Sequence, residues 1–146
     1  MTRLNGKCMC GAVTVAMTPA REAISICHCD MCRAWTSSAY MAVPAEPGSL
    51  EVSGPVRTFT SSAWAERAFC ETCGSALWYR ITAEGPMHGQ SQVAAGLFEN
   101  AGGLTPKLEV YIDKKPQGYA FEGERRTMTE AEVVAMYAPS DEGEPQ

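Results

Sequence analysis

The sequence has no long hydrophobic run and no excess of basic residues. No stretch of 18 consecutive apolar residues occurs among its 146 residues, so we expect no membrane-spanning segment and no membrane partner. Lys and Arg number 12 against 17 Asp and Glu, for a formal charge of −5, so we expect no nucleic-acid partner. The first twenty residues contain no continuous apolar segment, so we expect no signal peptide and a cytoplasmic protein.

Internal repeats and domain linkers are not evident either. We expect residues 1–138 to form a single domain and the acidic stretch 139–146, rich in Pro, Gly and Glu, to be a flexible tail. Many short β-like segments, broken by Gly, Pro and Ser, predict a mainly β fold. One short C-terminal helix is predicted at 130–137, because Thr129 and Glu132 form a capping box before the apolar Val133, Met136 and Tyr137. The predicted strands are 12–17, 23–29, 38–43, 50–53, 56–62, 66–70, 76–81, 91–96 and 107–112.

Seven cysteines occur at close spacings. An odd number excludes complete disulfide pairing within the chain, and a cytoplasmic protein seldom carries structural disulfides. Pairs separated by one or two residues are typical of metal ligands, so we favour a metal over redox thiols or disulfides. The spacings are Cys8-x-Cys10, Cys27-x-Cys29-x-x-Cys32 and Cys70-x-x-Cys73.

The spacing sorts these cysteines into two sets. In strands, residues i and i+2 share a face, so we expect Cys8 with Cys10, and Cys27 with Cys29, to direct their sulfurs together. Cys70-x-x-Cys73 is expected to form a tight turn, with Gly74 at positive φ. Two such pairs make a closed structural site of Cys8, Cys10, Cys70 and Cys73. Cys27, Cys29 and Cys32 then leave a second metal with an open position, although an idle or redox-active thiol trio remains an alternative.

Three segments resemble one known family. "GKCMCGAV" (6–13), "CHCDMCRAW" (27–35) and "RAFCETCGSALW" (67–78) are similar in order and spacing to the glutathione-dependent formaldehyde-activating enzyme (GFA, or CENP-V domain) family, over roughly residues 4–115. The resemblance implies an Mss4-like β fold with Zn²⁺, two per chain, and the same division of the cysteines. This sequence departs from the family at "TSSA" (36–39), at Phe98-Glu99, at Glu109 in place of a usual His, and near Tyr119 in place of a Trp.

Two functions follow as hypotheses. The first, implied by the resemblance, is a zinc-dependent carbon–sulfur lyase-type enzyme like S-hydroxymethylglutathione synthase. It would act on glutathione or a similar small thiol and a small aldehyde such as formaldehyde, with the thiol at the open zinc. In this hypothesis Cys27, Cys29 and Cys32 are catalytic through the metal. The second is a non-catalytic, zinc-stabilised module that binds a protein partner.

Further residues near the cysteines are candidates for substrate binding. Arg33 and Arg67 are the best-placed cations for the carboxylates of glutathione, and Trp35 could form an apolar wall beside the open metal. Alternatively, Arg33 pairs with Asp30 and Trp35 belongs to the core. His28 is expected to point away from the metal, towards a hydrogen-bond partner in the core.

Overall fold

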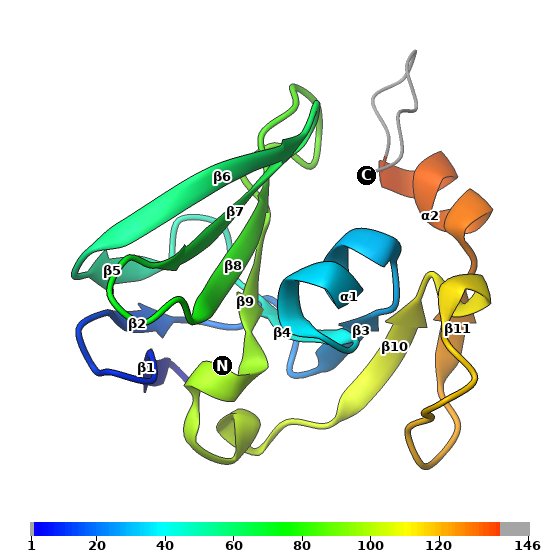
Figure 1. The fold of residues 1–146 in the computed structure, drawn as a ribbon, viewed down its shortest axis with the longest axis horizontal. Coiled ribbons are helices and arrows are strands. Elements are labelled where there is room, and N and C mark those ends of the chain that lie inside the picture. Colours follow the sequence, from blue (N-terminus) through cyan, green and yellow to red (C-terminus); the bar gives the residue numbers. More distant parts are fainter. Residues whose placement is uncertain (1, 138–146) are drawn as a thin grey trace.

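The computed structural model describes residues 2–137. Within this range the strands form a three-stranded sheet, in the order β1-β2-β5, and an eight-stranded sheet, in the order β11-β10-β3-β4-β9-β8-β7-β6. The large sheet curves around α1, which lies between β8–β9 on one side and β10–β11 on the other (Figure 1). β10 pairs in parallel with both β3 and β11, whereas the other neighbours in the described sheets are antiparallel. The elements in chain order are β1 Leu4–Lys7, β2 Thr14–Met17, β3 Ile24–Cys27, α1 Asp30–Thr36, β4 Tyr40–Pro44, β5 Glu51–Ser53, β6 Val56–Ser62, β7 Ala65–Cys70, β8 Ala76–Ile81, β9 Ser91–Ala94, η1 Ala95–Leu97, η2 Glu99–Gly103, β10 Pro106–Val110, η3 Ile112–Lys114, β11 Arg126–Met128 and α2 Glu130–Tyr137.

The mainly β fold and the short C-terminal helix expected from the sequence are confirmed. Each predicted strand is present, with ends that differ by at most two residues. The capping box of α2 also forms, because the backbone N–H of Thr129 donates to Glu132 Oε1 at 2.8 Å. Val133 is buried but Met136 is half exposed, and the side chain of Tyr137 and the stretch 139–146 lie outside the described residues.

Six elements were not predicted: β1, β11, α1 and the short 3-10 helices η1, η2 and η3. β1 is the sequence LNGK, which carries no β-branched or aromatic residue, and its extended form depends on pairing with β2. An isolated bridge between Gly6 and Phe98 also ties this strand to the rest of the fold. A Cβ atom at Gly6 would lie 2.5 Å from the carbonyl oxygen of Leu97, so this close approach requires glycine.

The core has two parts among the described residues. The larger contains Val13, Met17, Ile26, Leu77 and Val93, all less than 2% exposed. The smaller surrounds two cysteines, Cys29 and Cys32, and is formed by Tyr40, Ala42, Ala94, Tyr111, Met128 and Val133. The described residues include no helix with the length and hydrophobicity needed to cross a membrane.

Candidate metal centres and the adjoining cavity

The first centre is formed by Cys8, Cys10, Cys70 and Cys73, whose four sulfurs all lie within 4.8 Å of one another. The sulfur of Cys10 is 3.6 Å from that of Cys8 and 3.9 Å from that of Cys70. A tetrahedral zinc with bonds of about 2.3 Å places its sulfurs about 3.8 Å apart. The four thiols therefore fit a closed zinc site that joins the small sheet to the β7–β8 hairpin.

Backbone turns at the ends of strands direct these sulfurs. The prediction that Cys8 and Cys10 share a face of a strand is wrong: both follow β1, where the chain reverses towards β2. The backbone N–H groups of Val13 and Cys73 donate to the sulfurs of Cys8 and Cys70, at 3.3 and 3.4 Å. Gly74 has φ +81°, so the tight turn predicted for Cys70-x-x-Cys73 is confirmed. Such N–H groups stabilise sulfur in its anionic, metal-binding form.

The second centre is formed by Cys27, Cys29 and Cys32, whose sulfurs also lie within 4.8 Å of one another. Cys27 ends β3, Cys29 is the N-cap of α1, and Cys32 lies in its first turn, with its backbone N–H 3.3 Å from the Cys29 sulfur. The expectation that Cys27 and Cys29 share a strand is wrong, because β3 stops at Cys27 and the chain turns into the helix. Among residues 2–137 no fourth His, Cys, Asp or Glu has a ligand atom within this cluster.

The protons of the trio are held unequally. Hydrogen bonds from Cys27 and Cys32 lower the pKa of the Cys29 thiol to about 2, with a contribution from the charge of Arg67. Hydrogen bonding to Cys29 and Cys32, together with burial, raises the pKa of Cys27 well above its ordinary value. The hydrogen bond from Cys27 acts to lower the pKa of Cys32, but the hydrogen bond to Cys29 and burial outweigh it and raise this pKa to about 12. Alone, the trio therefore holds one anion, and a divalent cation would displace the remaining two protons.

Arg67 places a positive charge beside the trio. Its Nη1 lies 3.7 Å from the Cys32 sulfur, and the residue is only 3% exposed. Its guanidinium lies over the rings of Trp35 and Tyr79, with centroid distances of 4.9 and 5.0 Å. Of the predicted substrate-binding residues, the structure thus brings Arg67 and Trp35 together beside the trio.

Arg33 is oriented differently. It forms an ion pair with Asp30 one turn earlier in α1, and its Nε donates to the backbone oxygen of His28 at 3.0 Å. The pairing with Asp30 that we considered from the sequence is therefore present. The side chain remains 31% exposed, so this contact leaves part of the guanidinium at the surface.

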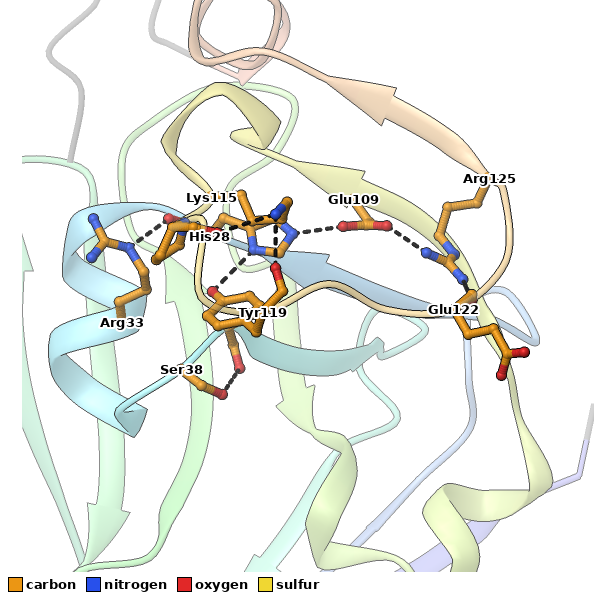
Figure 2. Close-up of polar contacts among 10 residues, drawn as sticks. His28, Arg33, Ser38, Glu109, Lys115, Tyr119, Glu122 and Arg125 are labelled. Carbon is orange, nitrogen blue, oxygen red and sulfur yellow. Dashed lines mark hydrogen bonds and ion pairs between the residues drawn. The ribbon is translucent and has the colours of Figure 1, made fainter.

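A polar network surrounds His28, the residue between Cys27 and Cys29 (Figure 2). His28 is fully buried; its Nε2 is 2.7 Å from Glu109 Oε1 and its Nδ1 is 3.2 Å from the Tyr119 hydroxyl. Glu109 also pairs with Arg125, whose side chain is 8% exposed. The expected core environment of His28 is confirmed. Both partners of its ring, Glu109 and Tyr119, are positions where the sequence departs from the family pattern.

A cavity of ≈ 90 Å³ adjoins the trio and is lined by Cys27 and Cys32. Tyr111 lines it too and combines two unfavourable features: its φ is +57°, and its hydroxyl is buried without a hydrogen-bond partner among the described residues. Burial, followed by the charge of Cys29, raises the pKa of Tyr111 above its ordinary value. No spacing in the sequence marks this cavity, because its residues come from β3, α1, β4, β8, β9, β10, α2 and the segments between these elements. The other lining side chains are Arg21, Ser25, Tyr40, Ala42, Trp64, Tyr79, Ile81, Gln90, Gln92, Leu108, Val110 and Val133.

The model of the family described as "Glutathione-dependent formaldehyde-activating enzyme" matches residues 3–114. The chain belongs to this family. A protein of Schizosaccharomyces pombe that is named an uncharacterized lyase is 32% identical over 137 residues, which is 92% of this chain and 96% of the relative. The crystal structure of a Rhodobacter sphaeroides protein is similar in fold, with a TM-score of 0.56 and 19% identity; the match covers 86% of this chain and 100% of that one. The GFA chain described here thus has the cysteine sets expected from the resemblance, in two clusters whose donors fit zinc.

Proposed function

We propose that this GFA-family protein is a carbon–sulfur lyase-type enzyme that joins a small thiol such as glutathione to a small aldehyde such as formaldehyde, or separates the two. The observation that carries the proposal is the trio Cys27, Cys29 and Cys32, which offers three sulfurs and, among the described residues, no fourth protein ligand. A zinc with three protein ligands and a free position is typical of catalytic sites, whereas four ligands are typical of structural ones.

The two cysteine clusters would hold one Zn²⁺ each. When bound at the trio, Zn²⁺ would lower the pKa of a substrate thiol and keep it as thiolate at neutral pH. The apolar cavity at the trio would keep the reacting atoms away from bulk water.

The reaction balances without an oxidant or reductant. The sulfur adds to the carbonyl carbon, a C–S bond forms, and the π pair of the C=O bond moves to oxygen. That oxygen takes up a proton, while the proton of the thiol is released to solvent. The reverse sequence separates the adduct into thiol and aldehyde.

Arg67 is positioned to support this chemistry. Three thiolates and one Zn²⁺ carry a net charge of −1, and a fourth thiolate makes it −2. A guanidinium 3.7 Å from the Cys32 sulfur offsets part of that charge, and its position between Trp35 and Tyr79 holds it in place. Arg33 is partly exposed and is proposed to bind a substrate carboxylate, which would replace Asp30 as the partner of its guanidinium.

Glutathione binding to the zinc-loaded protein tests the proposal. We expect calorimetry to detect binding of glutathione but not of S-methylglutathione, which keeps the carboxylates and lacks the free thiol. In the cobalt-substituted protein, glutathione should change the visible absorption of one of the two sites, and Cys32→Ser should abolish that change. A zinc-replete protein that binds neither glutathione nor any other small thiol would refute the enzyme and leave the non-catalytic binding module as the alternative.

A further inference from the structure

We propose that the cavity beside the cysteine trio binds the aldehyde of the reaction and that this aldehyde carries an apolar, preferably aromatic, substituent. In this proposal the Tyr111 hydroxyl donates a hydrogen bond to the carbonyl oxygen of the aldehyde. This inference rests on the proposed function and names the class of aldehyde that the site would take. It goes beyond formaldehyde, which has no substituent to bury.

The lining of the cavity indicates an apolar occupant. Next to Cys27 and Cys32 the walls are formed largely by aromatic and aliphatic side chains, such as Trp64, Tyr79, Val110 and Val133. A volume of ≈ 90 Å³ exceeds the space of a single water several-fold. Burying apolar surface against such walls stabilises a ligand in proportion to the area removed from water, so only a substituted aldehyde gains affinity there.

Tyr111 supplies the polar contact that an oxygen atom in this cavity requires. The residue is 3% exposed, and its hydroxyl has no hydrogen-bond partner among the described residues. Most buried polar groups in proteins are paired, and positive φ at a residue other than glycine is costly. Tyr111, at the junction of β10 and η3, combines an unpaired buried hydroxyl with a positive φ. We infer that this backbone conformation holds the hydroxyl where a ligand completes its hydrogen bond.

Two other phenols near the trio already have hydrogen-bond partners. The Tyr40 hydroxyl donates to the backbone oxygen of Gln92 at 2.6 Å, and the Tyr119 hydroxyl lies 3.2 Å from His28 Nδ1. Of the described phenols that line the cavity, Tyr40, Tyr79 and Tyr111, Tyr111 is the one whose hydroxyl is fully buried without a hydrogen-bond partner.

In the reaction, the Tyr111 hydroxyl would face the oxygen on which negative charge develops. As the thiol sulfur bonds to the carbonyl carbon, the C=O electron pair moves to that oxygen, and the oxygen then takes up a proton from solvent. A neutral phenol held by the fold stabilises this charge without being consumed.

Binding of small unreactive probes, two alcohols and one hydrocarbon, tests the inference without turnover. The zinc-loaded full chain is titrated with benzyl alcohol, toluene and methanol, and binding is followed by saturation-transfer NMR and by tryptophan fluorescence. We expect benzyl alcohol to bind at least about 10-fold more tightly than methanol, because only its ring fills the cavity. Tyr111→Phe should weaken benzyl alcohol about 10-fold and leave toluene unchanged, since toluene accepts no hydrogen bond.

Two further variants separate the cavity from general effects on folding. Val110→Phe narrows the cavity and should weaken benzyl alcohol and toluene alike. Tyr119→Phe makes the same chemical change outside the cavity lining and should leave both affinities at the wild-type value. Equal affinities for benzyl alcohol and methanol would overturn the inference, and so would a Tyr111→Phe protein that binds benzyl alcohol as the wild type does.

The thiol titration is done on the same samples. If glutathione binds and benzyl alcohol does not, the inference fails while the proposed function stands. If neither glutathione nor any other small thiol binds, the proposed function fails, whatever the alcohols show.

Discussion

Replacing Glu109 by glutamine removes one negative charge from the buried network of His28, Glu109 and Arg125 and hardly changes the size of the side chain. Glu109 is 6% exposed and joins the fully buried ring of His28 to the guanidinium of Arg125. After the change, Arg125 keeps its positive charge at a site where its side chain is 8% exposed.

The expected loss of stability follows from that uncompensated charge. Removing one partner of a buried ion pair costs about 3–5 kcal/mol, since the other charge stays out of water. For a domain of this size, 1 kcal/mol corresponds to roughly 3–4 °C in Tm, so Glu109→Gln should lower Tm by about 10–20 °C. Thermal and urea unfolding of the zinc-loaded protein measure the effect.

A matched control and a double-mutant cycle isolate the interaction. Arg3 and Glu51 form an ion pair at 2.7 Å between side chains that are 39% and 77% exposed, so Glu51→Gln should cost about 1 kcal/mol or less. Arg125→Met alone should be destabilising, and its combination with Glu109→Gln should cost less than the sum of the two. A Glu109→Gln protein as stable as Glu51→Gln would refute the view that Glu109 compensates the buried charge of Arg125.

The same variant should change the pH dependence of stability. Burial acts to raise the pKa of Glu109, but hydrogen bonds from His28 and Arg125 outweigh it and lower the pKa below its ordinary value. The stabilisation is therefore complete above the unfolded-state pKa of about 4.3 and is lost as pH falls through the lower folded-state pKa. The stability difference between wild type and Glu109→Gln should accordingly be constant near neutral pH and shrink in acid.

Two further predictions concern the metal centres. Metal analysis should give about two zinc ions per chain for the wild type and about one for either Cys73→Ser or Cys32→Ser; Cys73→Ser should have the lower Tm, because its site joins the two sheets. Arg67→Met should weaken glutathione binding about 10-fold or more in the same calorimetric assay. Arg67→Lys keeps the charge but loses the planar stacking on Trp35 and Tyr79, so its affinity for glutathione should lie between those of Arg67→Met and the wild type. Equal zinc contents in the three proteins, or equal affinities of Arg67→Met and wild type, would contradict the respective assignments.

The sequence alone indicated nine of the eleven described strands and the division of the cysteines. Alternating short segments predict strands because side chains on a strand alternate between faces, and each of these predictions is confirmed to within two residues. The spacing of Cys8, Cys10, Cys70 and Cys73 was sufficient to group them, because pairs that are close in sequence stay close in any fold. Even so, the local geometry of two pairs was predicted wrongly, since Cys8 and Cys10 follow a strand and Cys29 caps a helix that the sequence pattern did not reveal.

Only the tertiary structure decided what surrounds the trio. His28 and Glu109 are 81 residues apart in sequence, and they meet because β10 pairs in parallel with β3, in a register that sets Glu109 opposite Ile26. The sequence pattern indicates which residues are buried but not which strands pair with each other. The pairing of β10 with β3 brings Glu109 to the imidazole of His28. In the same way, Tyr111 reaches the cavity because β10 ends next to the last residue of β3, Cys27.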